Sequence, residues 1–121
     1  RRSSDLAVLQ HVATSLRLAT RATDYVVRWG GEEFLVLAPG TSLARAAETA
    51  EKLRAYIANT PTQEGHQVTI SLGVTGCDGH EPLEAAIARA DEALYAAKAA
   101  GRNRVTAKPP DAVAHEKAAF A

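Results

Sequence analysis

The chain has 121 residues, 46% of them hydrophobic and 23% charged, and its 14 acidic and 14 basic residues give a formal net charge of zero. This length and composition are typical of one globular domain with a single core. The balanced charge argues against a nucleic acid or an anionic membrane as a partner, whereas a small anionic ligand needs only a few local cations. The single cysteine, Cys77, excludes an internal disulfide and fits a reducing compartment.

The sequence shows no sign of a membrane span or of an N-terminal signal peptide. Neither a membrane-spanning apolar run nor the apolar segment of a signal peptide is present. Methionine is absent, even at position 1, so we expect the sequence to be a piece of a longer protein. Pro109 and Pro110 interrupt the regular patterns near the other end. We therefore predict one domain over residues 1–108 and a tail or linker over residues 109–121.

The first predicted element is a helix over residues 6–19, for which Ser4 or Asp5 is a candidate cap. Its apolar residues recur at helical spacing, which predicts one buried face. They are Leu6, Leu9, Ala13, Leu16 and Ala19. The aromatic residues Trp29 and Tyr95, further along the chain, are likewise expected to pack in the core or against a strand.

A hairpin is predicted next. Its strands cover residues 25–29 and 34–38, and Gly30 and Gly31 between them favour a tight turn. Pro39 then ends the second strand.

Two acids, Glu32 and Glu33, directly follow the glycines of the predicted turn. Such a pair can be no more than a solvated turn. Two bare glycines, however, let a ligand approach the backbone closely, and adjacent carboxylates offer oxygens that suit magnesium. The turn is therefore a candidate site for a metal ion with a phosphorylated ligand.

The second half of the chain predicts two helices and two strands. One helix covers residues 43–59, and alternating apolar residues indicate a strand over residues 68–74. A third helix begins at Pro82 and is capped by Gly101, and a short strand lies near Val105. This order of elements predicts an α+β fold in which helices pack against a central, largely antiparallel sheet.

Two further pairs of charged residues have spacings that suit a nucleotide. Arg21 and Asp24 can form a simple local ion pair, but an arginine also forks onto guanine or phosphate, and a carboxylate accepts from the opposite edge of guanine. Lys98 and Arg102 flank Gly101 at a helix end, where cations suit the helix dipole. The same two cations would also suit a triphosphate.

Several motifs in order give the chain a family resemblance. The hairpin sequence RWGGEEF, at residues 28–34, resembles the signature of GGDEF domains, the diguanylate cyclases, in the variant with Glu at its third position. VTISLGV at residues 68–74 resembles the central strand of that family. ADEALYAAKAAGRNRV at residues 90–105 resembles its closing helix and strand. The resemblance covers residues 6–108, and so many motifs in the correct order make a chance match improbable.

The resemblance implies an activity and a cofactor. It also implies a fold similar to that of nucleotidyl cyclases and polymerase palm domains. Members of this family join two GTP molecules into cyclic di-GMP and release two pyrophosphates. Each domain of a homodimer holds one GTP, with Mg²⁺ or Mn²⁺ as the cofactor. By this resemblance Glu32 binds the metal and Glu33 supports the same catalytic site.

The resemblance also implies which residues bind the substrate. Gly30 and Gly31 let the nucleotide approach the turn, while Lys98 and Arg102 hold the triphosphate. The chemistry depends on positioning and charge neutralisation more than on a protein nucleophile.

A separate inhibitory site for the product is implied beside the hairpin. Arg21 and Asp24 correspond to the RxxD motif with which the family binds cyclic di-GMP. The family often adds an arginine from the next helix. Lys52 stands there in this chain, which keeps the charge but loses the bidentate fork.

One part of the family pattern is missing. The first strand of the family carries an aspartate that is a second magnesium ligand, and an Asn and a GHxxGD segment that recognise guanine follow it. The family's spacing to Leu9 would place this aspartate at position 6, which is Leu6 in this chain. The nearest aspartate, Asp5, stands one position earlier. We therefore interpret residues 1–108 as an N-terminally incomplete GGDEF domain.

Two hypotheses follow. In the first, the chain is the greater part of a cytoplasmic diguanylate cyclase domain that is fused to sensory or regulatory domains. In the second, it is a catalytically inactive module that binds cyclic di-GMP through Arg21 and Asp24. Glu32 and Glu33 favour the first hypothesis, because a module without catalysis has no need of them. The missing segment favours the second.

Overall fold

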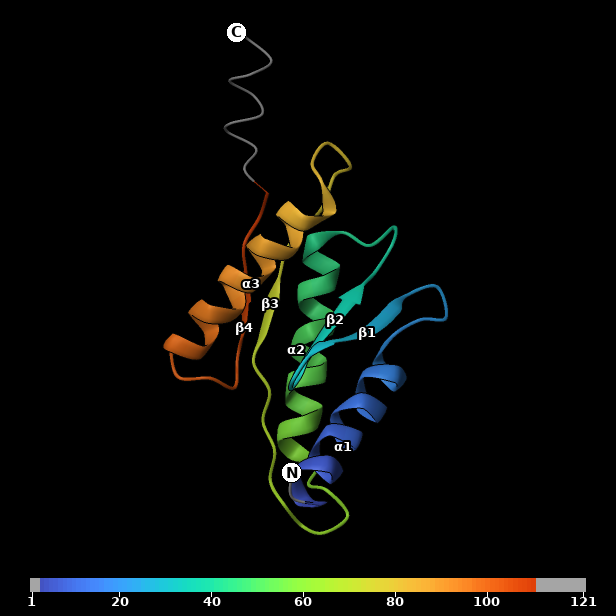
Figure 1. Ribbon diagram of the computed structural model, residues 1–121, viewed down its shortest axis with the longest axis vertical. Coiled ribbons are helices and arrows are strands. Elements are labelled where there is room, and N and C mark those ends of the chain that lie inside the picture. The colour runs from blue at the N-terminus through green and yellow to red at the C-terminus, as the bar shows by residue number, and fades with distance from the viewer. Residues whose placement is uncertain (1–2, 111–121) are drawn as a thin grey trace, which may run out of the picture.

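The computed structural model describes residues 3–110 and confirms the α+β class (Figure 1). Most of the predicted tail therefore lies outside the described residues. The elements, in chain order, are α1 Ser3–Ala19, β1 Tyr25–Gly30, β2 Glu33–Leu37, α2 Leu43–Asn59, β3 Leu72–Val74, α3 Leu83–Ala99 and β4 Val105–Ala107. Figure 1 shows α2 between α1 on one side and the β3–β4 pair with α3 on the other.

Local signals explain where α2 and α3 begin and end. The Ser42 hydroxyl accepts the backbone N–H of Arg45 and caps α2. Pro82 immediately precedes α3 as its N-cap, one position earlier than its predicted place in the first turn. At the other end, the N–H of Gly101 donates to Lys98 and that of Arg102 donates to Ala97, which is a Schellman ending.

The strands pair in two separate two-stranded sheets within the described part of the chain. β1 and β2 are antiparallel, whereas β3 and β4 are parallel. Between residues 3 and 110, the four strands therefore do not form the single, largely antiparallel central sheet that was predicted. The predicted strand over residues 68–74 is also shorter, because only Leu72–Val74 find partners on the three-residue β4. Among the described residues, no strand pairs with residues 68–71.

The core lies where α1 and α2 meet the chain around Val68. Its buried members are Val12, Leu16, Leu53, Ile57 and Val68. Val26 and Phe34 of the hairpin pack against this cluster. The predicted face of α1 was partly wrong, since Leu6 is 51% exposed while Val12 is buried. A helix can bury the face that carries Leu6 or the face that carries Val12, and contact with α2 buries the one that carries Val12.

Two aromatic residues lie outside the core, contrary to prediction. Trp29 is 56% exposed on the outer face of the hairpin, and Tyr95 is 76% exposed on α3. The face of α3 that is buried instead carries small residues, among them Ala93 and Ala97. Small side chains are needed there because Gly73 of β3 lies directly against the backbone of α3.

Candidate functional site

The turn of the hairpin presents Glu32 to solvent. Gly30 pairs with Glu33, so the two central residues of the turn are Gly31 and Glu32 rather than the predicted pair of glycines. Gly31 has φ +46°, the positive value that favours glycine at the first position of a tight hairpin turn. Neither Gly30 nor Gly31 has a neighbour within 4 Å of where a side chain would begin, so the outside of the turn is open.

Arg28 of β1 stabilises this turn through hydrogen bonds. Its Nε and Nη2 both donate to the carbonyl oxygen of Gly31, at 3.1 and 2.7 Å. The bonds hold the peptide that joins Gly31 to Glu32, and they lie where the strand pairing is irregular between Arg28 and Gly30. Sequence reasoning missed this role, although an arginine three residues before a turn glycine is within reach of its carbonyl.

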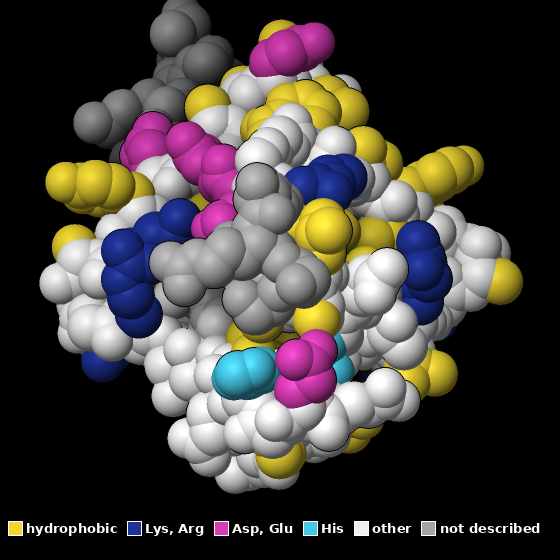
Figure 2. Space-filling model, turned by 60° about the horizontal axis from the view of Figure 1, so that its bottom comes forward, with side chains coloured by type: hydrophobic (Ala, Val, Ile, Leu, Met, Phe, Trp, Pro, Cys, Tyr) yellow, Lys and Arg dark blue, Asp and Glu magenta, His cyan; other side chains and the backbone are white. Residues whose placement is uncertain are grey.

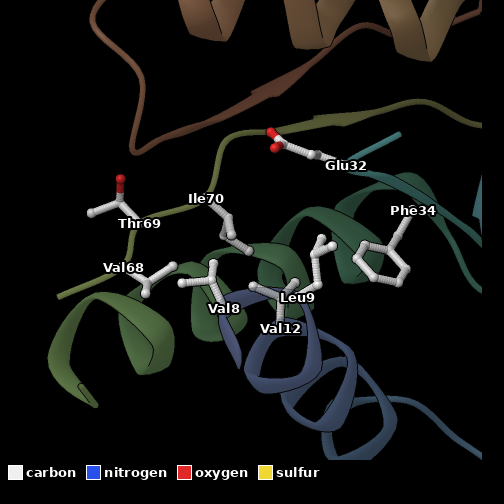
Figure 3. Close-up of a pocket in the computed structure, with 8 residues that line it drawn as sticks. All are labelled: Val8, Leu9, Val12, Glu32, Phe34, Val68, Thr69 and Ile70. Carbon is white, nitrogen blue, oxygen red and sulfur yellow. The ribbon is translucent and has the colours of Figure 1, made fainter. Parts of the chain in front are cut away.

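A groove of about 330 Å³ runs between the hairpin, α1 and residues 68–70 (Figure 3). Its lining comprises Val8, Leu9, Val12, Glu32, Phe34, Val68, Thr69 and Ile70. Figure 3 shows the carboxylate of Glu32 beside an otherwise mostly apolar wall. Glu33 is absent from this lining, because successive side chains along a strand point to opposite faces.

The donor set at the turn suits magnesium bound together with a substrate. Among residues 3–110, no group of three or more His, Cys, Asp and Glu side chains gathers into a metal cage. Magnesium is commonly held by one or two carboxylates, with phosphate and water oxygens completing its shell. Exposed Glu32, beside an open turn, fits that role as one protein ligand.

The two candidate triphosphate cations both lie at the end of α3. Lys98 lies in the last turn of the helix, and Arg102 follows its Schellman ending with φ 63°. Both side chains are exposed. Within the described residues, no hydrogen bond or ion pair joins them to Glu32 or Glu33. Glu32 and Glu33 are neighbours in sequence at the hairpin, and Lys98 and Arg102 both lie at the end of α3, but no bond between described residues connects the two places.

Arg21 and Asp24 form a closed network beside the start of α2. The Asp24 carboxylate accepts the backbone N–H of Arg21 at 2.8 Å and its Nη2 at 3.1 Å. The same Nη2 lies 2.9 Å from the Pro39 carbonyl and 2.7 Å from the Thr41 hydroxyl. The bond from the backbone N–H of Arg21 is the main reason that the pKa of Asp24 is lowered. Neither Pro39 nor Thr41 was predicted in this site.

Exposure separates the roles of these two side chains. That of Arg21 is 56% exposed, whereas that of Asp24 is only 7% exposed. Arg21 is therefore the member that a ligand can reach, and Asp24 faces Arg21 rather than solvent. Lys52 lies ten residues beyond Ser42 along α2, a rise of roughly 15 Å, and none of the bonds among the described residues joins it to this network.

Residues 5–104 match the family model described as "Diguanylate cyclase, GGDEF domain". The chain belongs to this family. Among curated relatives, diguanylate cyclase DgcP of Pseudomonas aeruginosa is 46% identical over 101 residues, which are 81% of this chain and 15% of that protein. The response regulator PleD of Caulobacter vibrioides is 44% identical over 107 residues, 84% of this chain and 24% of that protein. This GGDEF domain therefore spans less than a quarter of these relatives.

Solved GGDEF domains share the fold. The GGDEF domain of DgcB from Caulobacter crescentus, in complex with c-di-GMP, matches with a TM-score of 0.81 and 29% identity, covering 88% of this chain and 64% of that one. The active GGEEF domain of a diguanylate cyclase from Vibrio cholerae matches with a TM-score of 0.76 and 29% identity, covering 83% and 65%. These likenesses confirm the predicted GGDEF fold.

The surface of this GGDEF domain agrees with its balanced charge. On the face shown in Figure 2, Lys and Arg side chains occupy several separate places, and acidic side chains lie beside one of them. None of the helices in the described part of the chain has both the length and the apolar character needed to cross a membrane.

Proposed function

We propose that this GGDEF domain condenses two GTP molecules into cyclic di-GMP, as one half of a homodimer in the cytoplasm. The observation that carries the proposal is the open turn that presents Glu32, in a chain that belongs to the diguanylate cyclase family. The relatives are several times longer than this chain, which supports a place in a larger protein with sensory or regulatory domains.

Each group in the proposed site has a defined task. Magnesium or manganese, held by Glu32, would neutralise charge on the triphosphate, and Glu33, the next residue, would support the same site without lining the groove. Gly31 leaves room for the nucleotide beside the turn, and Lys98 and Arg102 bind phosphate oxygens by charge. Because phosphoryl transfer depends on positioning and charge, no protein nucleophile is required.

We further propose that an upstream extended segment completes the site. The groove beside Glu32 is bounded by β2 on one side and by residues 68–71, which lack a strand partner in the described chain, on the other. A strand between them would join the two small sheets and could bring a second carboxylate near Glu32. Asp5 does not supply this second carboxylate from a strand, because Asp5 belongs to α1.

Cyclic di-GMP formation from GTP and magnesium tests the proposal. We expect the longer protein to be active and the 121-residue chain to turn over little GTP. In the longer protein, Glu32→Gln should lower turnover at least about a hundredfold, because a metal ligand is lost. Glu64→Gln removes an exposed acid that pairs with His66 and should leave turnover unchanged. Equal losses in both variants would contradict the assignment of Glu32.

Product binding is a second candidate function, and the exposed guanidinium of Arg21 favours it. In this proposal Arg21 binds cyclic di-GMP, Asp24 holds Arg21 in place, and Lys52 adds charge from α2. Calorimetry with cyclic di-GMP should show binding to the 121-residue chain that Arg21→Ala abolishes. If the wild-type chain and the variant bind alike, the inhibitory-site assignment is wrong. Product binding with no cyclase activity in the longer protein would favour an inactive binding module.

A further inference from the structure

The loop after α3 holds Arg102 in an unusual backbone conformation. Arg102 and Asn103 have φ values of 63° and 48°, and Gly101 before them has φ 125°. Residues other than glycine seldom adopt positive φ, although asparagine does so more readily than most. Such a conformation persists only where surrounding contacts hold it, and it often marks a functional position.

Several contacts hold this loop from its own side of the fold. The backbone N–H of Asn103 donates to the Ser71 hydroxyl at 3.1 Å, and Arg104 Nε donates to the Arg102 carbonyl at 3.1 Å. The carbonyl of Arg104 then accepts the backbone N–H of Leu72 at 3.0 Å, just before β4 begins. These contacts fix both ends of the loop but leave the Asn103 side chain to another partner.

That partner is Arg54, on α2. Its Nη1 donates to Asn103 Oδ1 at 2.9 Å, across 49 positions of sequence. The other edge of the same guanidinium is held by Glu51, through Nε at 2.8 Å and Nη2 at 2.6 Å. Because a guanidinium is rigid and planar, the Glu51 fork aims Nη1 at Asn103. The Arg54 side chain is only 20% exposed, so this arrangement is partly shielded from water.

We propose that Arg54 is a positioning residue for Arg102. It fixes the Asn103 side chain, and with it the left-handed pair of residues that sets the direction of the Arg102 side chain. Arg54 itself is engaged by Glu51 and Asn103, so it acts through the loop rather than on substrate. The inference rests on the proposed function, in which Arg102 binds the triphosphate of GTP.

The proposal can be tested by NMR on the 121-residue chain, titrated with GTP and with inorganic tripolyphosphate, each with magnesium. In the wild-type chain we expect both ligands to shift the amide signals of Lys98 and Arg102. Arg54→Lys keeps the positive charge but loses the fork, and it should weaken both ligands about fivefold. Arg45→Lys alters an exposed arginine on the same helix and should leave both affinities unchanged.

A second variant separates positioning from general damage to the fold. Asn103→Gly tolerates positive φ but lacks Oδ1, so it should weaken both ligands as Arg54→Lys does. The double variant should be no weaker than either single variant, because both remove one interaction. Amide exchange at Arg102 and Asn103 should rise in each variant, while the unfolding temperature of the chain stays within about 2 °C.

The outcomes separate this inference from the proposed function. If neither ligand shifts Lys98 or Arg102 in the wild-type chain, these residues do not bind a triphosphate, and the proposed substrate site falls together with the inference. If the wild-type chain binds both ligands and Arg54→Lys binds them equally well, only the role of Arg54 is overturned. Additive losses in the double variant would also overturn it.

Discussion

The hairpin turn and the end of α3 carry the two halves of the candidate site, and they are built differently. The turn that presents Glu32 is held by strand pairing and by the fork of Arg28 onto Gly31. The N–H of Arg102, in contrast, forms part of a Schellman ending, and the next residue, Asn103, is bonded to Ser71 and to Arg54 of α2. The half that we propose to bind phosphate is thus fixed within the described chain, whereas the half that we propose to bind metal has fewer restraints.

Packing explains this difference. The β3–β4 pair is contacted by both α2 and α3, and Gly73 brings β3 directly against α3. The hairpin contacts mainly itself, although Val26 and Phe34 reach the core. Its outer face leaves Trp29 exposed, and its β2 edge faces the groove, where no further strand of residues 3–110 pairs with it. A hairpin is only marginally stable by itself, so its position depends strongly on what it packs against.

The largest expected effect is on the well-packed half. In Gly73→Ala, the added Cβ would overlap the carbonyl oxygen of Ala90 and the backbone nitrogen of Leu94, so α3 must move away from β3. We expect a loss of at least about 3 kcal/mol in the free energy of unfolding. Urea denaturation followed by circular dichroism measures this loss. In Gly76→Ala, the Cβ would meet Pro110 at 3.6 Å, an ordinary contact, so this control should stay near wild type.

The same contrast explains which parts of the structure could be predicted from the sequence. Helix caps and periodicity depend on neighbouring residues, so α2, with buried Ala50, Leu53 and Ile57, was predicted correctly. The pairing of the two sheets was not, because it depends on long-range partners. Apolar alternation over residues 68–74 indicates a strand, but it cannot say which strand lies beside it.

Candidate site residues were proposed from the sequence where a motif names them, as at Glu32 and Arg102. The residues that hold them were missed. Arg54 and Asn103 lie 49 positions apart, and no local pattern connects them. Arg28 was missed for a different reason, because its fork onto a backbone carbonyl depends on the shape of the turn.

The second prediction concerns the less restrained half. Arg28→Lys keeps a cation but cannot place two donors on the Gly31 carbonyl. We expect amide exchange at Gly31 and Glu32 to rise about fivefold, since about 1 kcal/mol of local restraint is lost. Arg17→Lys serves as the control, because Arg17 of α1 lies on the same side of the hairpin as Arg28. It should leave the exchange at Gly31 and Glu32 unchanged. Unchanged exchange in Arg28→Lys would show that strand pairing alone holds the turn.

The third prediction uses pH to compare the two regions. In the β3–α3 connection, the hydrogen bonds from Arg89 lower the pKa of Glu81, and Arg89 also holds Thr75 and the carbonyl of Gly76. A carboxyl whose pKa is lower in the folded state stabilises that state above its unfolded pKa. This stability is lost as the pH falls through the folded pKa. We therefore expect stability to fall below about pH 5.

Variants assign this acid sensitivity to one region or the other. Glu81→Gln should make the stability of the chain less dependent on pH in urea denaturation between neutral and acidic conditions. The pKa of Asp24, beside the hairpin, is lowered by the N–H of Arg21, so Asp24→Asn should also flatten the profile. Glu64→Gln, in an exposed loop, should not. A profile that neither Glu81→Gln nor Asp24→Asn changes would contradict both assignments.

The smallest expected effects are at the exposed aromatic side chains, one in each region. Tyr95→Gln on α3 should change the free energy of unfolding by less than about 0.5 kcal/mol, because Tyr95 is 76% exposed. Trp29→Thr on the hairpin, at 56% exposure, should also cost little in this chain, since threonine suits a strand. Chemical denaturation of both variants measures these changes. A loss of more than about 1 kcal/mol in Trp29→Thr alone would show that the outer face of the hairpin contributes packing that its exposure conceals. The contrast between a restrained and a loosely held half would then be smaller than the contacts indicate.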